Sequence, residues 1–421
     1  MLAVRPRALT ARAVGLPFSS LALHLAFTFP PRLAFARAAP WCEGQNLEGA
    51  DLAPDAMRDA GLSDAVKSLG LSFTDRGDVD FTSVAPSTNH YSIGLYREWL
   101  SSNPTANFAT WMRKRETNKK KKSGESTMAR KRSYETALHE QSLINVVNAE
   151  LIGDGLRLVH DAVHAAVLRE GPQKPFVLTV GGDHSIASAS ISALQAQHPN
   201  LGVIWVDAHA DANTPRSSPS GHYHGMPAAH LLGWFEKPGE MGEGSKAVSL
   251  PGFDWFPSGC LSESRLAYIG LRDVDPEEAR LLRRSGVRIF TMRDVDKHGI
   301  AKVIEMAIEA VGPSMDNPLH LSLDVDAIDP HYAPGTGTAA RGGLTYREIH
   351  YICEECALTK RLVSMDVVEV NPGLDPPPEK SANPLEEAGA MHGDHPSIRR
   401  ASPTVRLAVE LVLSALGKQI C

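Results

Sequence analysis

Short apolar runs, each followed directly by polar residues, recur along this chain. Five of them lie at 175–180 (PFVLTV), 202–206 (GVIWV), 265–271 (RLAYIGL), 319–323 (LHLSL) and 361–365 (RLVSM). Continuous apolar runs of this length, bounded by turn-forming residues, are typical of β-strands buried on both faces. We therefore predict buried strands over these five ranges.

Longer segments with helical periodicity accompany these runs, at 143–170, 300–312, 346–358 and 402–418. Strands that alternate with helices favour a mainly parallel sheet, because parallel strands need a crossover connection between them. We predict an α/β fold with three layers, α/β/α, around that sheet.

Titratable residues gather where three predicted strands end. The sequences are GGDHS at 181–185, DAHAD at 207–211 and DVDAIDP at 324–330. Ligands of such sheets bind beyond the carboxyl ends of the strands, so the three clusters are expected to share one crevice. Four carboxylates and two imidazoles there would repel one another unless about two divalent cations neutralised them. Oxygen-rich ligation favours Mn²⁺ over Cu²⁺ or Zn²⁺ without deciding between them. The candidate ligands are His184, Asp207, His209, Asp211, Asp324 and Asp326.

Composition narrows the class of protein. The 421 residues, 43% of them hydrophobic, suffice for a large single core or for two domains. A net charge of −6 over this length argues against nucleic acid or an anionic membrane as the main partner, and no apolar run reaches the ~18 residues of a membrane span. Five scattered cysteines indicate a reducing compartment. Cys353 and Cys356 are expected on one face of a helix, not in a zinc site.

Two segments differ from this pattern. Before Glu43 there are five arginines and no acidic residue, a composition that resembles a mitochondrial transit peptide. A disordered extension is the alternative. In either case we assign the N-terminal extension to residues 1–31. Residues 103–132 are strongly basic, and we expect a disordered insertion, with a nucleic-acid-binding patch as the alternative. We expect a cytoplasmic protein, with the mitochondrial matrix as the alternative.

The motifs, taken together, resemble the arginase branch of the ureohydrolase family. The matching stretches are GQNLEGADLAPDAMRDAGL (44–62), GGDHS, DAHADANTP, SGHYHGMP, IGLRDVDPEE, SLDVDAIDP, GGLTYRE and VVEVNP, in the order of the family. The resemblance implies one ureohydrolase domain over 32–420 and a binuclear manganese site. It also implies hydrolysis of L-arginine to L-ornithine and urea by a hydroxide that bridges the two metals, in a homo-oligomer for which a trimer is favoured.

Ligand roles follow from the same resemblance. Asp207 and Asp324 match the carboxylates that bridge the two ions. His184 and Asp211 would complete one manganese site, and His209 and Asp326 the other. Asp211 would also orient the hydroxide.

The resemblance extends to the substrate. Glu369 matches the carboxylate that binds the guanidinium, and His224 matches the histidine that passes a proton to the leaving amine. The remaining substrate contacts are implied for Asn213 and Ser220 at the α-carboxylate, Asp275 and Glu278 at the α-ammonium, and Thr338 near the guanidinium. His222 stands where animal arginases usually have asparagine, a difference that we expect to change substrate affinity and not reaction type.

Two other functions are compatible with part of this pattern. An agmatinase would keep the metals and Glu369 but would have no use for ligands of an α-carboxylate. A non-catalytic metal-binding scaffold would be expected to lack a ligand or His224, and neither is missing.

Overall fold

A parallel sheet organises the part of the chain that the structure describes. The structure is a computed structural model that describes residues 22–27, 32–38, 49–79, 146–168, 175–235, 250–314, 316–376 and 397–419. Its strands are β1 Ala22–Phe27, β2 Arg32–Ala38, β3 Ser72–Asp78, β4 Phe176–Val180, β5 Gly202–Val206, β6 Leu266–Leu271, β7 Arg288–Thr291, β8 Leu319–Asp324 and β9 Leu362–Val368.

Six strands form the all-parallel centre of the sheet, in the order β4-β9-β8-β5-β6-β7. Beside β4, β2 continues the parallel arrangement and β1 pairs in antiparallel fashion. The five buried strands predicted from the sequence are confirmed. The short strand β7 was not predicted, because its four residues, one exposed and three partly buried, leave no apolar run to detect. β1 lies within residues 1–31, the range that the sequence analysis assigned to an N-terminal extension. The domain boundaries remain predictions.

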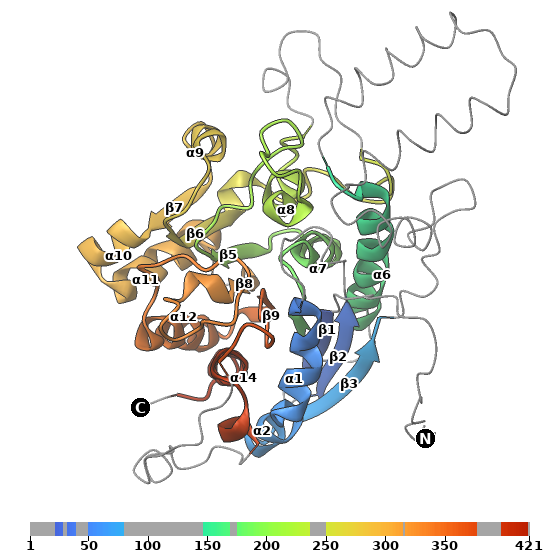
Figure 1. Ribbon diagram of the computed structural model, residues 1–421, viewed down its shortest axis with the longest axis vertical. Helices are drawn as coiled ribbons and strands as arrows, with labels where there is room; N and C mark the ends of the chain where they lie inside the picture. The colour runs from blue at the N-terminus through green and yellow to red at the C-terminus, as the bar shows by residue number, and fades with distance from the viewer. Residues whose placement is uncertain are drawn as a thin grey trace, which may run out of the picture. The chain divides into compact units, whose positions relative to one another are not determined.

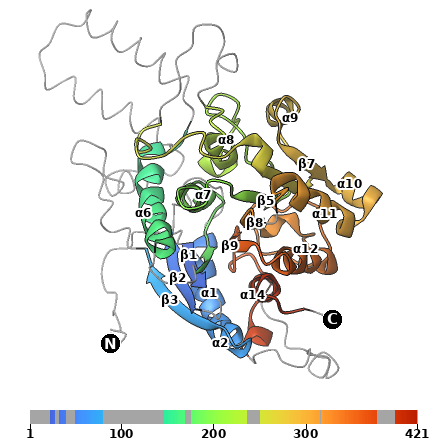
Figure 2. The same ribbon diagram turned by 180° about the vertical axis from the view of Figure 1, so that it is seen from behind.

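Helices cover both faces of the sheet (Figures 1 and 2). They are α1 Ala53–Asp59, α2 Leu62–Ser68, α6 Ala149–Val167, α7 Ile186–Gln195, α8 Pro227–Leu231, α9 Pro276–Leu282, α10 Met292–His298, α11 Ile300–Val311, α12 Tyr346–Leu358 and α14 Pro403–Ala415. The α/β prediction is confirmed, and α12 spans the predicted range 346–358. Thr345 and Glu348 start α12 with a reciprocal capping box, which satisfies backbone donors at its first turn.

Two apolar clusters fill the spaces between the layers. Alternate residues of a strand point to opposite faces, so Leu321 and Leu323 of β8 pack against α11, α12 and α14. On the other face, Trp205 of β5 lies in the cluster that includes residues of α6, α7 and α8. The result is the three-layer arrangement.

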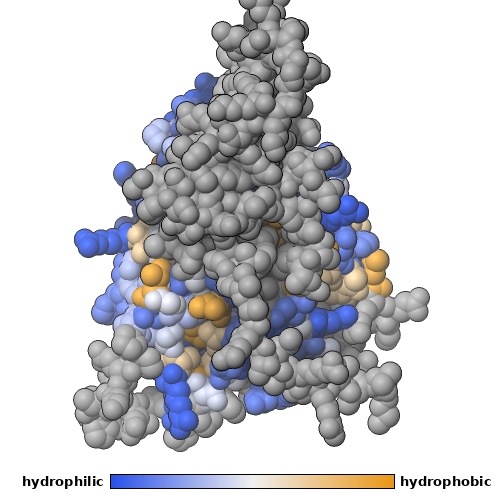
Figure 3. Space-filling view, turned by 45° about the vertical axis from the view of Figure 1, so that its right-hand side comes forward, coloured by the Kyte–Doolittle hydropathy of each residue, from blue (hydrophilic) through white to orange (hydrophobic). Residues whose placement is uncertain are grey.

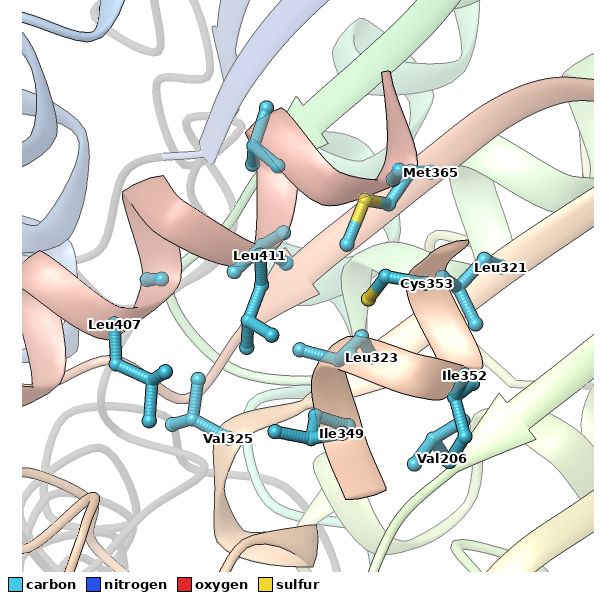
Figure 4. Close-up of a cluster of buried hydrophobic side chains, with 14 of the residues drawn as sticks. Val206, Leu321, Leu323, Val325, Ile349, Ile352, Cys353, Met365, Leu407 and Leu411 are labelled. Atoms are coloured by element: carbon cyan, nitrogen blue, oxygen red, sulfur yellow. The ribbon is translucent and has the colours of Figure 1, made fainter. Parts of the chain in front are cut away.

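The Cys353–Cys356 pair belongs to the first of these clusters. Both thiols are buried and free, and Cys353 lies among apolar side chains that include Leu321 and Met365 (Figure 4). Burial raises the pKa of both thiols, so they remain protonated. The expected placement of both thiols on one face of a helix is confirmed.

On the face that Figure 3 shows, the visible part of the described surface has hydrophilic side chains with apolar areas between them. The large exposed apolar side chains of the described residues come from separate elements, among them Leu52, Leu168 and Leu358, which is ordinary for a globular protein. Within the described ranges no helix has the length and hydropathy needed to cross a bilayer. The expected basic insertion at 103–132 lies outside the described residues.

Candidate metal centre and active site

The carboxyl ends of four neighbouring strands meet at one edge of the sheet. Their register pairs Val180 of β4 with Val367 of β9, Asp324 of β8 with Val368 of β9, and Val206 of β5 with Leu323 of β8. The residues just beyond these positions are the strand-end clusters of the sequence. Parallel pairing in this order therefore brings together motifs that lie more than 100 residues apart.

One group of candidate ligands surrounds His184. Its Nδ1 atom lies 3.1 Å from Asp207 Oδ2, 3.1 Å from Asp211 Oδ2 and 3.3 Å from Asp324 Oδ2. Its Nε2 atom is 2.9 Å from the Ser322 hydroxyl, which can fix the tautomer and leave Nδ1 facing the carboxylates. His184 Nδ1 is buried and makes no hydrogen bond of satisfactory geometry.

A second group shares Asp207 with the first. His209 Nδ1 lies 2.9 Å from Asp326 Oδ2 and 3.6 Å from Asp207 Oδ1. The ligand atoms of His184, Asp207 and Asp211 lie within 4.8 Å of one another, and so do those of Asp207, His209 and Asp326. Asp207 is therefore placed to serve both groups.

Charges in these groups perturb one another. Burial disfavours a charged His184, but the nearby carboxylates of Asp207, Asp211 and Asp324 outweigh it and put its pKa well above the ordinary value. Burial also opposes charge on His209, and Asp326 and Asp207 overcome that effect in the same way, raising its pKa. In the metal-free protein both imidazoles thus carry the positive charge that the carboxylates require.

This donor set fits divalent cations. Four buried carboxylates around two imidazoles leave an excess of negative charge that bound cations would offset. Carboxylate oxygens and imidazole nitrogens are ligands that Mn²⁺ accepts.

Glu369 follows β9 and is almost fully buried next to this centre. Its Oε1 atom accepts a hydrogen bond from the His184 backbone N–H at 3.0 Å and lies 3.7 Å from His224 Nδ1. Glu369 has φ 63° and Asp211 has φ 48°, a left-handed backbone that L-residues other than glycine rarely adopt. Strain of this kind is concentrated at functional sites, where packing imposes it.

His224 lies in the short 3₁₀ helix η4, Tyr223–Gly225. Burial disfavours its charged form, but the hydrogen bond and charge of Glu369, with the charges of Asp183 and Asp211, raise its pKa to about 9. In the metal-free protein His224 is therefore a cation at neutral pH.

Asn213, Asp275 and Glu278 form one linked set. The Asn213 amide donates to Asp275 Oδ2 at 2.9 Å and accepts from Ser217 Oγ at 2.8 Å. The two oxygens of Glu278 accept the backbone N–H groups of Ala212 and Asp275, at 2.8 and 3.0 Å. Burial, with the charge of Asp211, raises the pKa of Glu278 to about 8.

A cavity of about 220 Å³ joins these parts. Its lining consists of His209, Asp211, Asn213, Ser218, Ser220, His224, Gly225, Asp273, Asp275, Glu278, Asp324, Asp326, Thr338 and Glu369. Thr338 donates to Asp326 Oδ2 at 2.8 Å, so it contacts a candidate ligand as well as the cavity. His222 is not among the described residues of the lining, although its ring centroid is 5.9 Å from that of His224.

Several residues of the site were not singled out from the sequence. Asp183 is buried beside His184, and burial and the charge of Glu369 raise its pKa to about 7. Ser322 precedes Asp324 by two positions, so the strand period alone puts both on one face. Arg272 contacts the backbone of the Asp326 segment and had no signal beyond its place in RDVDPEE.

Comparison with known proteins agrees with this geometry. The family model described as "Arginase family" matches residues 36–388. The chain belongs to the arginase family. This membership makes the protein a hydrolase. The matched range includes both groups of candidate ligands and Glu369.

Individual relatives support the assignment over most of the chain. An arginase of Plasmodium berghei is 35% identical over 91% of this chain and 92% of its own length. The bovine protein named "Arginase-2, mitochondrial" is 36% identical over 90% and 83% of the two chains. The solved arginase of Bacillus caldovelox aligns over 90% of this chain and 96% of its own, with TM-score 0.62 and 27% identity. The arginase-family fold is thus supported by both sequence and structure.

Proposed function

We propose that this chain hydrolyses L-arginine to L-ornithine and urea with two Mn²⁺ ions per chain. One observation carries the proposal: two His/Asp groups that share Asp207 lie at the same cavity as the buried carboxylate of Glu369. A cavity that is lined by candidate metal ligands and by the buried carboxylate of Glu369 suits a substrate that is itself a planar cation.

His184, Asp207, Asp211 and Asp324 would hold one ion, and Asp207, His209, Asp324 and Asp326 the other. The bridging role of Asp324 rests on the family resemblance and on its 3.3 Å distance from His184. When bound, two divalent cations would lower the pKa of a shared water molecule towards neutrality.

Glu369 would bind the guanidinium of the substrate. A carboxylate accepts two parallel N–H bonds from a planar guanidinium, which fixes both its position and its orientation. The His184 N–H bond to Oε1 and the constrained backbone at φ 63° hold the carboxylate in place before substrate arrives.

His224 would donate the proton that the leaving amine needs. An alkylamine is a poor leaving group until it is protonated, and a positioned histidine commonly supplies that proton. Glu369, 3.7 Å from Nδ1, favours the protonated ring, so the acid is ready before the carbon–nitrogen bond breaks. Asp211 would orient the attacking water from its position beside His184.

The amino-acid end of the substrate would face the Asn213–Asp275–Glu278 set. Both oxygens of Glu278 already accept backbone N–H groups, so Asp275 is better placed for direct contact with the α-ammonium, with Glu278 as its support. Asn213 and Ser220 would bind the α-carboxylate. Thr338 would lie near the guanidinium while it donates to Asp326. His222 would affect substrate affinity from outside the lining of the cavity.

A homo-oligomer, with a trimer favoured, and a cytoplasmic or mitochondrial location complete the proposal. They rest on the family resemblance and on the N-terminal composition. The bovine relative is named as mitochondrial.

Substrate choice tests the proposed reaction. Arginine and agmatine share the guanidinium and differ in the α-carboxylate, so loss of about two charge-assisted hydrogen bonds should cost agmatine roughly 3–6 kcal/mol, or about 10²- to 10⁴-fold in kcat/KM. Urea release from both substrates by the Mn²⁺-loaded protein measures this ratio. Equal hydrolysis of both substrates would replace the arginase assignment with an agmatinase.

Asp275→Ala should raise KM for arginine and for agmatine, because both carry the ammonium group that Asp275 would bind. Glu277→Ala is the matched control, because Glu277 is exposed on the same helix and pairs with Arg280. If Glu277→Ala and Asp275→Ala change KM equally, the recognition role of Asp275 is wrong.

A further inference from the structure

Arg272 occupies an unusual position beside the second ligand group. It follows β6, and all five N–H donors of its guanidinium lie within hydrogen-bond distance of backbone carbonyls. Nη2 donates to Asp326 O at 2.6 Å and to Ala340 O at 2.7 Å. Nη1 donates to Ala327 O at 3.0 Å and to Gly270 O at 3.2 Å, and Nε donates to Arg341 O at 3.2 Å.

Two of these carbonyls, those of Asp326 and Ala327, belong to the segment that carries a ligand of the second group. Asp326 is itself a candidate ligand, and residues 340–341 follow Thr338, which donates to the Asp326 carboxylate. The backbone N–H of Arg272 donates to Ala208 O at 2.9 Å, between Asp207 and His209. Arg272 therefore joins two ligand segments. Its backbone N–H contacts the segment of Asp207 and His209, its side chain contacts the segment of Asp326, and none of these contacts reaches Asp211 or His184.

The surrounding chain makes room for this side chain. A Cβ atom at Gly343 would lie 2.6 Å from Arg272 Nη2. The Asp329 carboxylate accepts the backbone N–H groups of Gly342 and Gly343, which holds that turn against the guanidinium. A flat, five-donor group fits here, whereas a lysine ammonium has three donors and no fork.

We infer that Arg272 is a positioning residue that sets the affinity of the second metal group, Asp207, His209 and Asp326, and leaves the first group largely unaffected. The inference rests on the proposed two-metal function. Residues that orient metal ligands from outside typically change metal affinity by about 10- to 100-fold when they are substituted. The Arg272 side chain acts directly on the segment that carries Asp326, so the second group should show an effect in this range.

Mn²⁺ binding to the full, metal-stripped chain tests the inference without any measurement of activity. The electron paramagnetic resonance signal of free Mn²⁺ gives a binding isotherm, and the parent should bind two ions. Asp211→Asn and Asp326→Asn identify which binding class belongs to which group. Arg272→Lys should weaken the Asp326 class by about 10- to 100-fold and leave the Asp211 class within about threefold.

Arg361→Lys is the matched control. Arg361 also binds backbone carbonyls, with Nε to Asn317 O at 2.8 Å and Nη2 to Gly312 O at 2.9 Å, but it lies before β9, at the opposite edge of the sheet. It should lower the melting temperature and leave the isotherm unchanged. Circular dichroism checks folding, and Arg272→Gln replaces Arg272→Lys if the latter does not fold.

The outcomes separate the two proposals. A parent that binds fewer than two ions contradicts the two-metal function and not the role of Arg272. If the parent binds two ions and both Arg272 variants bind them as the parent does, or lose both classes equally, the positioning role is refuted. Selective loss in Arg361→Lys would refute it as well.

Discussion

Replacing the shared carboxylate should disable both ligand groups at once. In Asp207→Asn the shape of the side chain is kept and its charge is lost. Oδ1 of Asp207 accepts the His209 backbone N–H at 2.7 Å, and Oδ2 accepts Trp205 Nε1–H at 2.9 Å. An asparagine has a single acceptor oxygen, so in either orientation its NH₂ group must face one of these two donors. The substitution therefore removes a ligand charge and leaves a buried donor without an acceptor.

The size of the effect follows from the burial of the site. Removal of one partner from a buried charge interaction costs about 3–5 kcal/mol, which corresponds to roughly 10²- to 10⁴-fold in Kd. Asp207 belongs to both groups, so this loss should apply to each of two Mn²⁺ ions. Asp211 belongs to the first group alone, and Asp211→Asn should weaken one ion and spare the other.

Isothermal titration of metal-stripped protein with Mn²⁺ measures both constants, and elemental analysis after dialysis counts the ions retained. Asp211→Asn serves as the single-group control. The reasoning fails if Asp207→Asn keeps one ion at the parent affinity, or if Asp211→Asn loses both. A melting curve of each metal-free variant separates loss of ligation from loss of the fold.

Two further predictions follow from the same centre. His224→Asn should lower kcat by about 10²-fold or more with unchanged Mn²⁺ content, because a proton donor and not a ligand is removed. Loss of metal along with activity would make His224 a ligand. Binding of two Mn²⁺ ions at pH 7 should release protons, since the raised pKa values of His184, His209 and Asp324 favour the protonated groups in the metal-free protein and ligation needs them deprotonated. Protons and metal then compete, so the affinity for Mn²⁺ should fall by about tenfold or more per ion for each unit of decreasing pH. The heat of binding should vary with the ionisation enthalpy of the buffer, and an invariant heat would contradict the expectation.

The sequence by itself was sufficient for the local features of this protein. An apolar run such as 202–206 followed by Asp207 predicts a buried strand with a polar end, because the strand period and the turn residues are properties of adjacent positions. The capping residues of α12 and the helical face of Cys353 and Cys356 are local in the same sense. The strand-end position of His184, Asp207 and Asp324 therefore followed from pattern alone.

The pairing of those residues was decided only by the tertiary structure. His184 meets Asp324 because β4, β9 and β8 are neighbours in the sheet, and no periodicity encodes that order. The same holds for Ser322 beneath His184 and for Arg272 behind Asp326, whose partners lie 138 and 54 residues away. Contacts of this kind depend on strand order and loop closure, which the whole chain determines by burying its apolar faces. The residue types indicated the chemistry of the site. The residues that position the candidate ligands, such as Ser322 and Arg272, could be identified only from the folded structure.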